Sequence, residues 1–324
     1  MTTRSQSLLS ILLLSMLIGQ AVPAWAQDWP TRQPVKVIVP FTAGSATDVI
    51  ARAVFNQISR QIDQSVLVEN RSGAGTTLGS AVVAKADPDG YTLLVNSTSH
   101  VVVATTFPKL PYSVSEDFIA LSALAAQPFV ITTRTKYKSI ADLVEFGRAN
   151  PGVLNYGSNG IGTSGMLFME KFALVAKIKM THVPFRGTPE AMTEIVADRL
   201  DMFPGPALSM LELAKSGNVN ALAVSTPQRS SSMPDVPTLA EAGLPGADYT
   251  FWIGAFAPAK TPRSVAERIH SEIIKALSSP DVKKKIADLA ADPMPMSMAE
   301  FDAFVRKEIK LNADIFAAAG ITPQ

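Results

Sequence analysis

One short turn, Pro40-Phe41-Thr42-Ala43-Gly44-Ser45-Ala46-Thr47-Asp48, has the composition of an anion-binding loop. Small side chains let a ligand approach the backbone, and the first N–H groups of a helix are unpaired and carry the positive end of its dipole. Lysine and arginine are absent between Pro40 and Asp48, so a carboxylate held there would depend on N–H and hydroxyl donors. The alternative is an ordinary strand-to-helix connection with Thr47 or Asp48 as the N-cap.

A second turn of this kind runs from Ser158 to Gly165, and its sequence is Ser-Asn-Gly-Ile-Gly-Thr-Ser-Gly. Its glycines lack the G-x-G-x-x-G spacing of a dinucleotide loop, and the chain has no G-x-x-x-x-G-K-[ST] motif. A third polar tip, which includes Ser97 and Thr98, follows the apolar run 91–95. These patterns predict no cofactor.

Catalytic chemistry has little support in the sequence. The chain has 3 histidines and no G-x-S-x-G turn, H-E-x-x-H motif or cysteine, so neither a nucleophilic triad nor a metal site is indicated. Asp48 and Asp201 could pair as acid and base, but we expect Asp48 to cap a helix or loop and Asp201 to accept from a ligand. The chain is predicted not to be an enzyme, and the alternative is an exported hydrolase or lyase.

Four further residues are candidates for the walls of a binding site. Phe41, Tyr156 and Phe203 lie at or beside predicted strand ends, where each could line a cleft or belong to the core. Arg186 is the cation nearest to the two turns, and it could contact a ligand or only hold its own loop.

The N-terminus has the pattern of a secretory signal peptide. Arg4 precedes an apolar run from Leu8 to Ile18, and Ala24-Trp25-Ala26 predicts cleavage after Ala26. Removal of residues 1–26 lowers Lys+Arg from 29 to 28, equal to the 28 acidic residues, so nothing favours nucleic acid or an anionic membrane. With no cysteine to carry a disulfide or a lipid, we expect a soluble, exported, periplasmic monomer.

Strand and helix patterns alternate along the mature chain, which predicts an α/β fold with mostly parallel sheets. Because ligands bind outside the carboxyl ends of such strands, the polar tips should gather at one edge. The run 118–133, interrupted by Pro128, fits two short strands at a crossover, and the proline-rich 233–237 fits a return linker. The predicted division is a signal peptide at 1–26, a first lobe at 27–125, a second lobe at 126–232, and a return to the first lobe at 233–324, with a hinge at the two crossings.

The order of several motifs resembles a known family. These motifs are Pro40-Phe41-x-Ala43-Gly44-x-x-x-Asp48, Glu69-Asn70-Arg71-x-Gly73-Ala74-Gly75, Asp89-Gly90-Tyr91-Thr92-Leu93, Tyr156-Gly157-Ser158-x-Gly160-x-Gly162-Thr163, Val183-Pro184-Phe185-Arg186-Gly187, Pro234-Asp235-Val236-Pro237-Thr238 and Trp252-x-Gly254. Together they resemble the Bug-type, TctC-like extracytoplasmic solute receptors of tripartite tricarboxylate transport systems. The resemblance covers essentially the whole mature chain.

The resemblance implies a two-lobed periplasmic binding protein of type II, the Venus-flytrap fold, with two mostly parallel sheets and a hinge. It implies capture of a small carboxylate between two loops, Phe41 to Asp48 and Ser158 to Ser164, and delivery to the membrane permease subunits of the transporter. The chain departs from the family pattern in two places: Ser45 stands at a usual glycine, and Ser164-Gly165-Met166 stands where a histidine is common. The residues expected to contact the ligand are Phe41, Ala43, Gly44, Ser45, Ala46, Thr47, Asp48, Ser97, Thr98, Tyr156, Ser158, Gly160, Thr163, Ser164, Arg186, Asp201 and Phe203.

Overall fold

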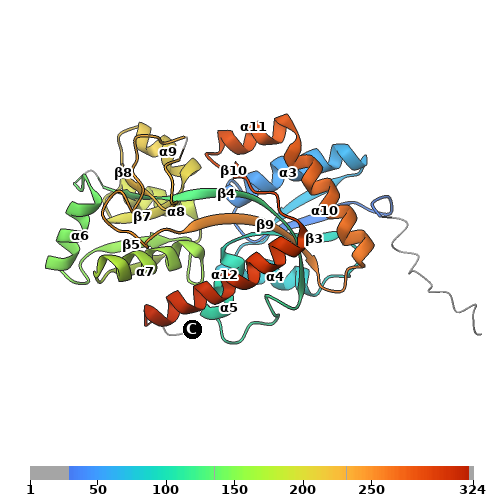
Figure 1. Ribbon diagram of the computed structural model, residues 1–324, viewed down its shortest axis with the longest axis horizontal. Helices are drawn as coiled ribbons and strands as arrows, with labels where there is room; N and C mark the ends of the chain where they lie inside the picture. The colour runs from blue at the N-terminus through green and yellow to red at the C-terminus, as the bar shows by residue number, and fades with distance from the viewer. Residues whose placement is uncertain (1–28, 135, 231, 321–324) are drawn as a thin grey trace, which may run out of the picture.

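The structure is a computed structural model that describes residues 29–134, 136–230 and 232–320. The expected signal peptide and its cleavage site lie outside these residues. Two groups of strands, each with its own helices, lie side by side and are joined by two long strands (Figure 1). This arrangement matches the predicted two-lobed α/β architecture.

In the first lobe, parallel strands form one side of the sheet. Strand β1 (Val35–Val39) lies between β2 (Val66–Asn70) and β3 (Thr92–Ser97) and is parallel to both. The elements that follow these strands are α3 (Ala46–Ile62), η1 (Ala74–Thr76), α4 (Thr77–Ala84) and α5 (Ser99–Thr106). The C-terminal part of the chain adds α10 (Arg263–Ser278), α11 (Pro280–Asp288), β10 (Asp292–Pro293) and α12 (Met298–Ala318).

The second lobe repeats the pattern on a smaller scale. Strand β5 (Asn155–Ser158) is parallel to β6 (Thr181–Pro184) and to β7 (Met202–Pro206). The other elements are α6 (Ile140–Ala149), α7 (Ser164–Ala176), α8 (Thr188–Val196), α9 (Ala207–Lys215) and β8 (Asn220–Val224).

The two lobes share β4 (Phe118–Thr133) and β9 (Thr250–Pro258), which run antiparallel to each other. The first part of β4 pairs with β9, and its last residues pair with β7 and β8. The strand order is therefore β2-β1-β3-β9-β4-β7-β5-β6, with β8 and β10 also paired to β4. The predicted pair of short strands at Pro128 is in fact one continuous strand, because Pro128 sits opposite Thr250 at the end of β9 without breaking β4.

The segment expected to be a return linker packs against the second lobe. The N–H of Val224 donates to Pro237 O at 2.9 Å, and that of Tyr249 donates to Ser225 O at 2.7 Å. These contacts favour an end of the second lobe near Tyr249, rather than at the predicted residue 232.

Helix α12 makes a further connection between the lobes. Its capping box begins at Ser297, and Phe301 packs edge-on against Trp252 in the first lobe. Near its C-terminal end, Ile315 and Phe316 form a buried cluster that includes Leu167 of α7 in the second lobe. Figure 1 shows α12 crossing from one lobe toward the other.

Candidate functional site

The starts of α3, α5 and α7 converge on a small cavity between the lobes. Its volume is about 20 Å³, which is about the space of one water molecule. Its lining consists of Phe41, Ser45, Ala46, Thr47, Ser99, Phe129, Asn159, Thr163, Ser164, Gly165, Thr188, Pro206 and Phe251. Six of the predicted site residues are therefore brought together, and the lining contains no charged side chain.

The first loop is held in shape by its own polar groups. Gly44 has φ +80°, which favours glycine, and Ser45 is the N-cap of α3, accepting from the N–H of Asp48 at 3.3 Å. The Asp48 carboxylate accepts from Gly44 N–H at 2.9 Å, Arg52 Nε at 3.0 Å and Asn70 Nδ2 at 2.8 Å. Asp48 thus stabilises the conformation of the loop and does not line the cavity.

The hydrogen bonds to Asp48 also determine whether its carboxyl group is ionised. Burial by itself raises the pKa of this carboxyl, but the hydrogen bonds from Arg52, Gly44 and Asn70 and the charge of Arg52 outweigh burial and hold the pKa below its ordinary value. Asp48 is therefore ionised at neutral pH, and its charge is satisfied within its own lobe.

The free donors of the first loop lie at the first two residues of α3. The N–H groups of Ala46 and Thr47, which are the first two positions of α3, make no hydrogen bond to a described residue. The hydroxyl of Thr47 also makes no hydrogen bond to a described residue, and both residues line the small cavity. The donors expected at Ala43 to Ser45 lie elsewhere: Ala43 and Gly44 are exposed, and Ser45 N–H donates to Thr42 O.

The second loop uses most of its hydroxyls internally. Ser158 is fully buried and its Oγ lies 2.6 Å from His182 Nε2, while Gly160 N–H donates to the same Oγ at 3.1 Å. The hydroxyl of Thr163 donates to Gly160 O at 2.7 Å. The N–H of Gly165, which lines the cavity, has no acceptor among the described residues.

A serine from each lobe lines the small cavity, and the two serines contact each other. Ser164 N–H donates to Ser99 Oγ at 3.0 Å, and the two hydroxyl oxygens are 3.3 Å apart. Both side chains are buried. Ser99 was missed among the site residues, although it belongs to the polar tip that includes Ser97 and Thr98. The run Val101–Val103 favours a strand over a helix, which hid the fact that Ser99 begins α5.

A larger cavity of about 570 Å³ adjoins the small one, and Phe41, Asn159 and Thr163 line both. Its other walls are Pro40, the turn Ser72–Thr76, Phe107, Gly160, Ile161, Pro184, Phe185 and Arg186. The turn Ser72–Thr76 was recognised in the sequence as a small-residue turn, but it was not included in the site.

Nine predicted residues line neither cavity: Ala43, Gly44, Asp48 and Ser158, which belong to the two loops, and five others. Thr98 accepts from Trp252 N–H at 2.9 Å, and Ser97 Oγ accepts from Ser99 N–H at 3.3 Å. Asp201 precedes β7 at the opposite end of the strand and binds Asn155 N–H and Lys136. The remaining two, Tyr156 and Phe203, are core residues with 0% and 1% exposure.

Ser158 and His182 lie within hydrogen-bonding distance, as in a catalytic dyad, but their surroundings do not fit catalysis. Burial lowers the pKa of His182 to about 4, and its ring stacks on Tyr156. The Tyr156 hydroxyl donates to Glu170 at 2.5 Å, and burial together with the adjacent Glu170 raises the pKa of Tyr156. Ser158 and His182 line neither cavity, so we assign them a structural role in holding the second loop.

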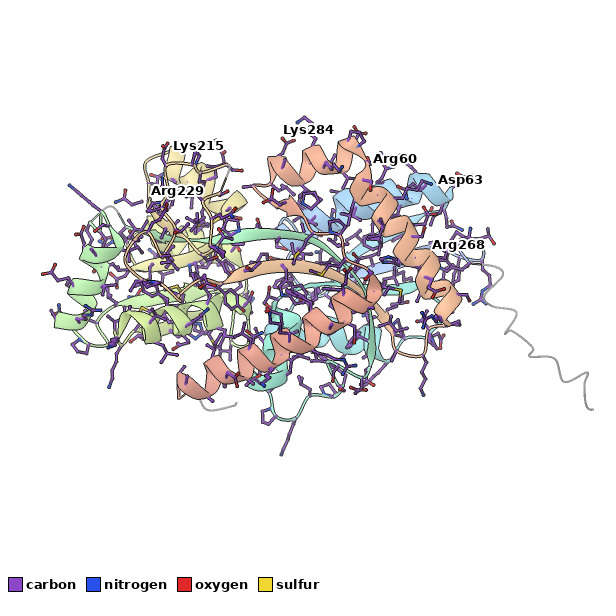
Figure 2. All side chains as sticks on the ribbon, viewed as in Figure 1. Arg60, Asp63, Lys215, Arg229, Arg268 and Lys284 are labelled. Atoms are coloured by element: carbon purple, nitrogen blue, oxygen red, sulfur yellow. The ribbon has the colours of Figure 1, made fainter. Side chains whose placement is uncertain are left out.

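Charged groups lie mainly at the periphery. Figure 2 shows Arg60, Arg268 and Lys284 at the outer helices of the first lobe and Lys215 at the outer edge of the second. Across the three described ranges, no group of three or more His, Cys, Asp or Glu side chains could hold a metal ion. None of the helices in these ranges is long and apolar enough to cross a membrane.

Comparison with known proteins identifies the family. The family model of TctC, the tripartite tricarboxylate transporter family receptor, matches residues 50–321. The UPF0065 protein in the tcbD–tcbE intergenic region of a Pseudomonas strain is 40% identical over 264 residues, which are 81% of this chain and 78% of that protein. BugT of Bordetella pertussis is 33% identical over 310 residues, which are 93% and 94% of the two chains.

Solved structures agree with this assignment. A Rhodopseudomonas palustris protein solved with adipate has a TM-score of 0.87 and 29% identity, covering 92% of this chain and all of its own (100%). MatC from the same organism, with bound malate, has a TM-score of 0.82 and 30% identity, covering 88% and 99%. The periplasmic binding protein BugD has a TM-score of 0.85 and 26% identity, covering 90% and 99%.

These likenesses confirm the two-lobed periplasmic-binding-protein fold. The family and its structural neighbours are solute-binding proteins and not enzymes, so the prediction of a non-enzyme is confirmed and the hydrolase or lyase alternative is set aside. The chain belongs to the family of tripartite tricarboxylate transporter receptors.

Proposed function

We propose that this chain is a periplasmic receptor that captures a small carboxylate between its lobes and delivers it to the permease subunits of a tripartite tricarboxylate transporter. The observation that carries the proposal is the cavity at the starts of α3 and α7. Unpaired N–H groups of Ala46, Thr47 and Gly165 belong to residues that line it, and no acidic side chain lies there to repel an anion. Solved neighbours hold adipate and malate, which are both dicarboxylates.

The donor arrangement explains how a carboxylate could be held without a cation. Two helix N-termini present positive partial charge to the same point, and each N–H that meets a carboxylate oxygen forms a charge-assisted hydrogen bond. Such bonds contribute roughly 1.5–3 kcal/mol each when buried. Because the donors come from both lobes, the anion itself would link the lobes, which favours closure around it.

A ligand screen by thermal shift tests the proposal. A carboxylate present at 100 times its dissociation constant should raise the free energy of unfolding by about 2.7 kcal/mol, enough to raise the melting temperature clearly. The screen should include mono-, di- and tricarboxylates, with the matching amides as uncharged controls. Stabilisation by acids and not by their amides is the expected result. If no acid stabilises the protein at millimolar concentration, the receptor proposal is wrong.

Location and processing form a separate part of the proposal. The predicted cleavage after Ala26 would give a mature periplasmic protein that begins at Gln27. Mass spectrometry of the periplasmic fraction should find that N-terminus on a soluble monomer. A membrane-bound chain that still contains Arg4 would contradict it.

A further inference from the structure

The larger cavity carries an inference about which carboxylates are bound, and it rests on the proposed function. We propose that this cavity holds the body of the ligand, and that the preferred ligands are carboxylic acids with an aromatic ring. The carboxylate would lie at the starts of α3 and α7, and the ring would lie in the 570 Å³ cavity beside them. The two cavities share Phe41, Asn159 and Thr163, so they lie next to each other.

The walls of the larger cavity have the chemistry of a ring-binding site. Three half-buried aromatic side chains, Phe41, Phe107 and Phe185, come from three different segments and surround the space. Aromatic rings pair with one another in stacked or edge-to-face geometry and gain more than their buried area alone provides. Pro40, Pro184 and Ile161 add apolar surface.

The remaining wall is formed by a turn of small residues. The turn Gly73-Ala74-Gly75 forms this side. A Cβ atom at Gly75 would lie 2.4 Å from Ile161 O and 3.2 Å from Phe107 Cε2, so this wall meets the second lobe directly. A cavity with aromatic sides and a wall of small residues suits a planar group better than a branched polar chain.

Three polar side chains in the wall already have hydrogen-bond partners. Thr163 donates to Gly160 O, Asn159 exchanges hydrogen bonds with Thr188, and Thr76 accepts from Asn96. Short hydroxy acids and dicarboxylates would leave their second polar group among apolar walls, which is unfavourable. A second carboxylate could be neutralised near Arg186, which is exposed at the cavity.

Among the described residues, Arg186 is also the one charged residue that lines the larger cavity. Its positive charge attracts an acid and repels an organic cation of the same shape. The cavity should therefore reject phenethylamine and accept phenylacetate or 3-phenylpropionate.

Calorimetric titration of the full mature chain tests the proposal. The probes are phenylacetate and 3-phenylpropionate, compared with malate and adipate, and phenethylamine is the charge control. We expect the two aryl acids to bind roughly tenfold or more tightly than malate and adipate, because burial of the ring removes apolar surface from water. Phenethylamine should show no binding.

Two variants locate the ring. Phe107→Leu should weaken the binding of aryl acids by roughly tenfold and change the binding of malate and adipate little, because it removes an aromatic wall. Ser72→Trp, at an exposed position of the turn, should do the same by filling the cavity. Phe304→Leu is the matched control, since Phe304 is also half-buried in the first lobe but lies on α12 and does not line the cavity.

The outcomes separate the two proposals. If malate or adipate binds as tightly as the aryl acids, or if Phe107→Leu and Ser72→Trp weaken all acids equally, the aromatic preference is overturned and the receptor function stands. If no acid of either class binds, the receptor function fails and the preference fails with it.

Discussion

At the scale of single residues, the structure separates hydroxyls that are free from hydroxyls that are occupied. Thr47 presents an unbonded hydroxyl at the small cavity, whereas the hydroxyl of Ser158 is bonded to His182 and is fully buried. Sequence patterns place both in anion-binding turns and cannot tell them apart, because the difference depends on a histidine in the neighbouring strand β6.

Thr47→Val should therefore weaken carboxylate binding by roughly tenfold to a hundredfold, the loss of one hydrogen bond to a charged group. Valine keeps the shape of threonine, so the free energy of unfolding should change little. Ser158→Ala is the comparison: it should lower stability more than affinity, since it leaves His182 without its partner. Calorimetry and thermal unfolding of both variants measure the two effects. Equal affinity losses in the two variants would contradict this assignment.

His182 predicts a pH dependence of stability. Burial lowers its pKa from 6.5 to about 4, so between these values the unfolded chain binds a proton that the folded chain does not. The free energy of unfolding should accordingly fall as the pH is lowered from 6.5 toward 4. His182→Gln removes this titration, and should make the slope shallower by up to about 1.4 kcal/mol per pH unit.

The measurement is urea unfolding of both proteins from pH 4 to pH 8. His100, whose pKa burial lowers to about 3, titrates in both proteins and cancels in the comparison. Parallel curves for the two proteins would show that His182 is protonated alike in the folded and unfolded chains.

At the scale of elements, the first position of α3 offers a direct test of backbone binding. Ala46 follows the N-cap Ser45, whose φ of −66° and ψ of 157° are compatible with a following proline. Proline is well accepted at this position of a helix and has no N–H. Ala46→Pro should thus keep the helix and weaken binding by roughly tenfold or more, while Ala46→Gly, which keeps the N–H, should bind nearly as the parent does.

Circular dichroism and calorimetry check the fold and the affinity of these two variants. A proline variant that folds and binds with unchanged affinity would exclude the Ala46 N–H as a ligand donor.

The closing of the lobes depends on a glycine at the start of α8. A Cβ atom at Gly187 would lie 2.8 Å from Thr42 Oγ1 of the other lobe. Gly187 has φ −176°, which any residue adopts, so a side chain there causes no backbone strain and only blocks the approach. Gly187→Val should weaken binding by roughly tenfold with little loss of stability, because the branched side chain would meet Thr42 where the two lobes approach each other.

The double variant Thr42→Ala with Gly187→Val supplies the control. Removal of the threonine branch should restore much of the affinity, since the two changes act on one contact. Additive losses would show that Gly187 acts in some other way.

The elements themselves were largely predictable from the sequence. The ranges 35–39, 66–70 and 140–149 match β1, β2 and α6, because apolar periodicity and turn residues agree there. Helix α5 was missed because its valines favour a strand in isolation, and burial of Val101 to Val103 against the sheet overrides that preference. The continuity of β4 past Pro128 depends on pairing with β9 up to Pro128 and with β7 and β8 beyond it, and these strands all lie far along the chain.

Prediction of the site from the sequence is limited in the same way, because contacts between distant residues are not visible in local patterns. Both anion-binding turns and the turn at Ser72–Thr76 are visible as small-residue stretches that follow strands. The position of Asp201 at the wrong end of its strand, and the pairing of Ser99 with Ser164, depend on the three-dimensional arrangement. No local pattern encodes either of them.

At the scale of the whole molecule, the Ser99 and Ser164 contact predicts how opening controls exchange of ligand. Their hydroxyl oxygens lie 3.3 Å apart across the seam, and the chain has no cysteine. Ser99→Cys with Ser164→Cys, once oxidised, should join the lobes and prevent ligand from entering. Reduction should restore binding, and each single cysteine variant should bind in both redox states.

Stopped-flow binding measures the exchange, and small-angle scattering measures the compaction. The parent protein should become more compact on saturation with ligand, and the oxidised variant should be compact throughout. Rapid ligand exchange in the fully oxidised variant would contradict entry by separation of the lobes.

The position of β9 in the sheet has a consequence for the order of folding during synthesis. β9 lies between β3 and β4, so the sheet of the first lobe lacks its middle strand until residues 250–258 have emerged from the ribosome. Until then β3 and β4 each have an unpaired edge, and the long sequence separation makes this pairing slow. A nascent chain of this topology cannot complete its first lobe before β9 is made, so that lobe would still be open during the export proposed above.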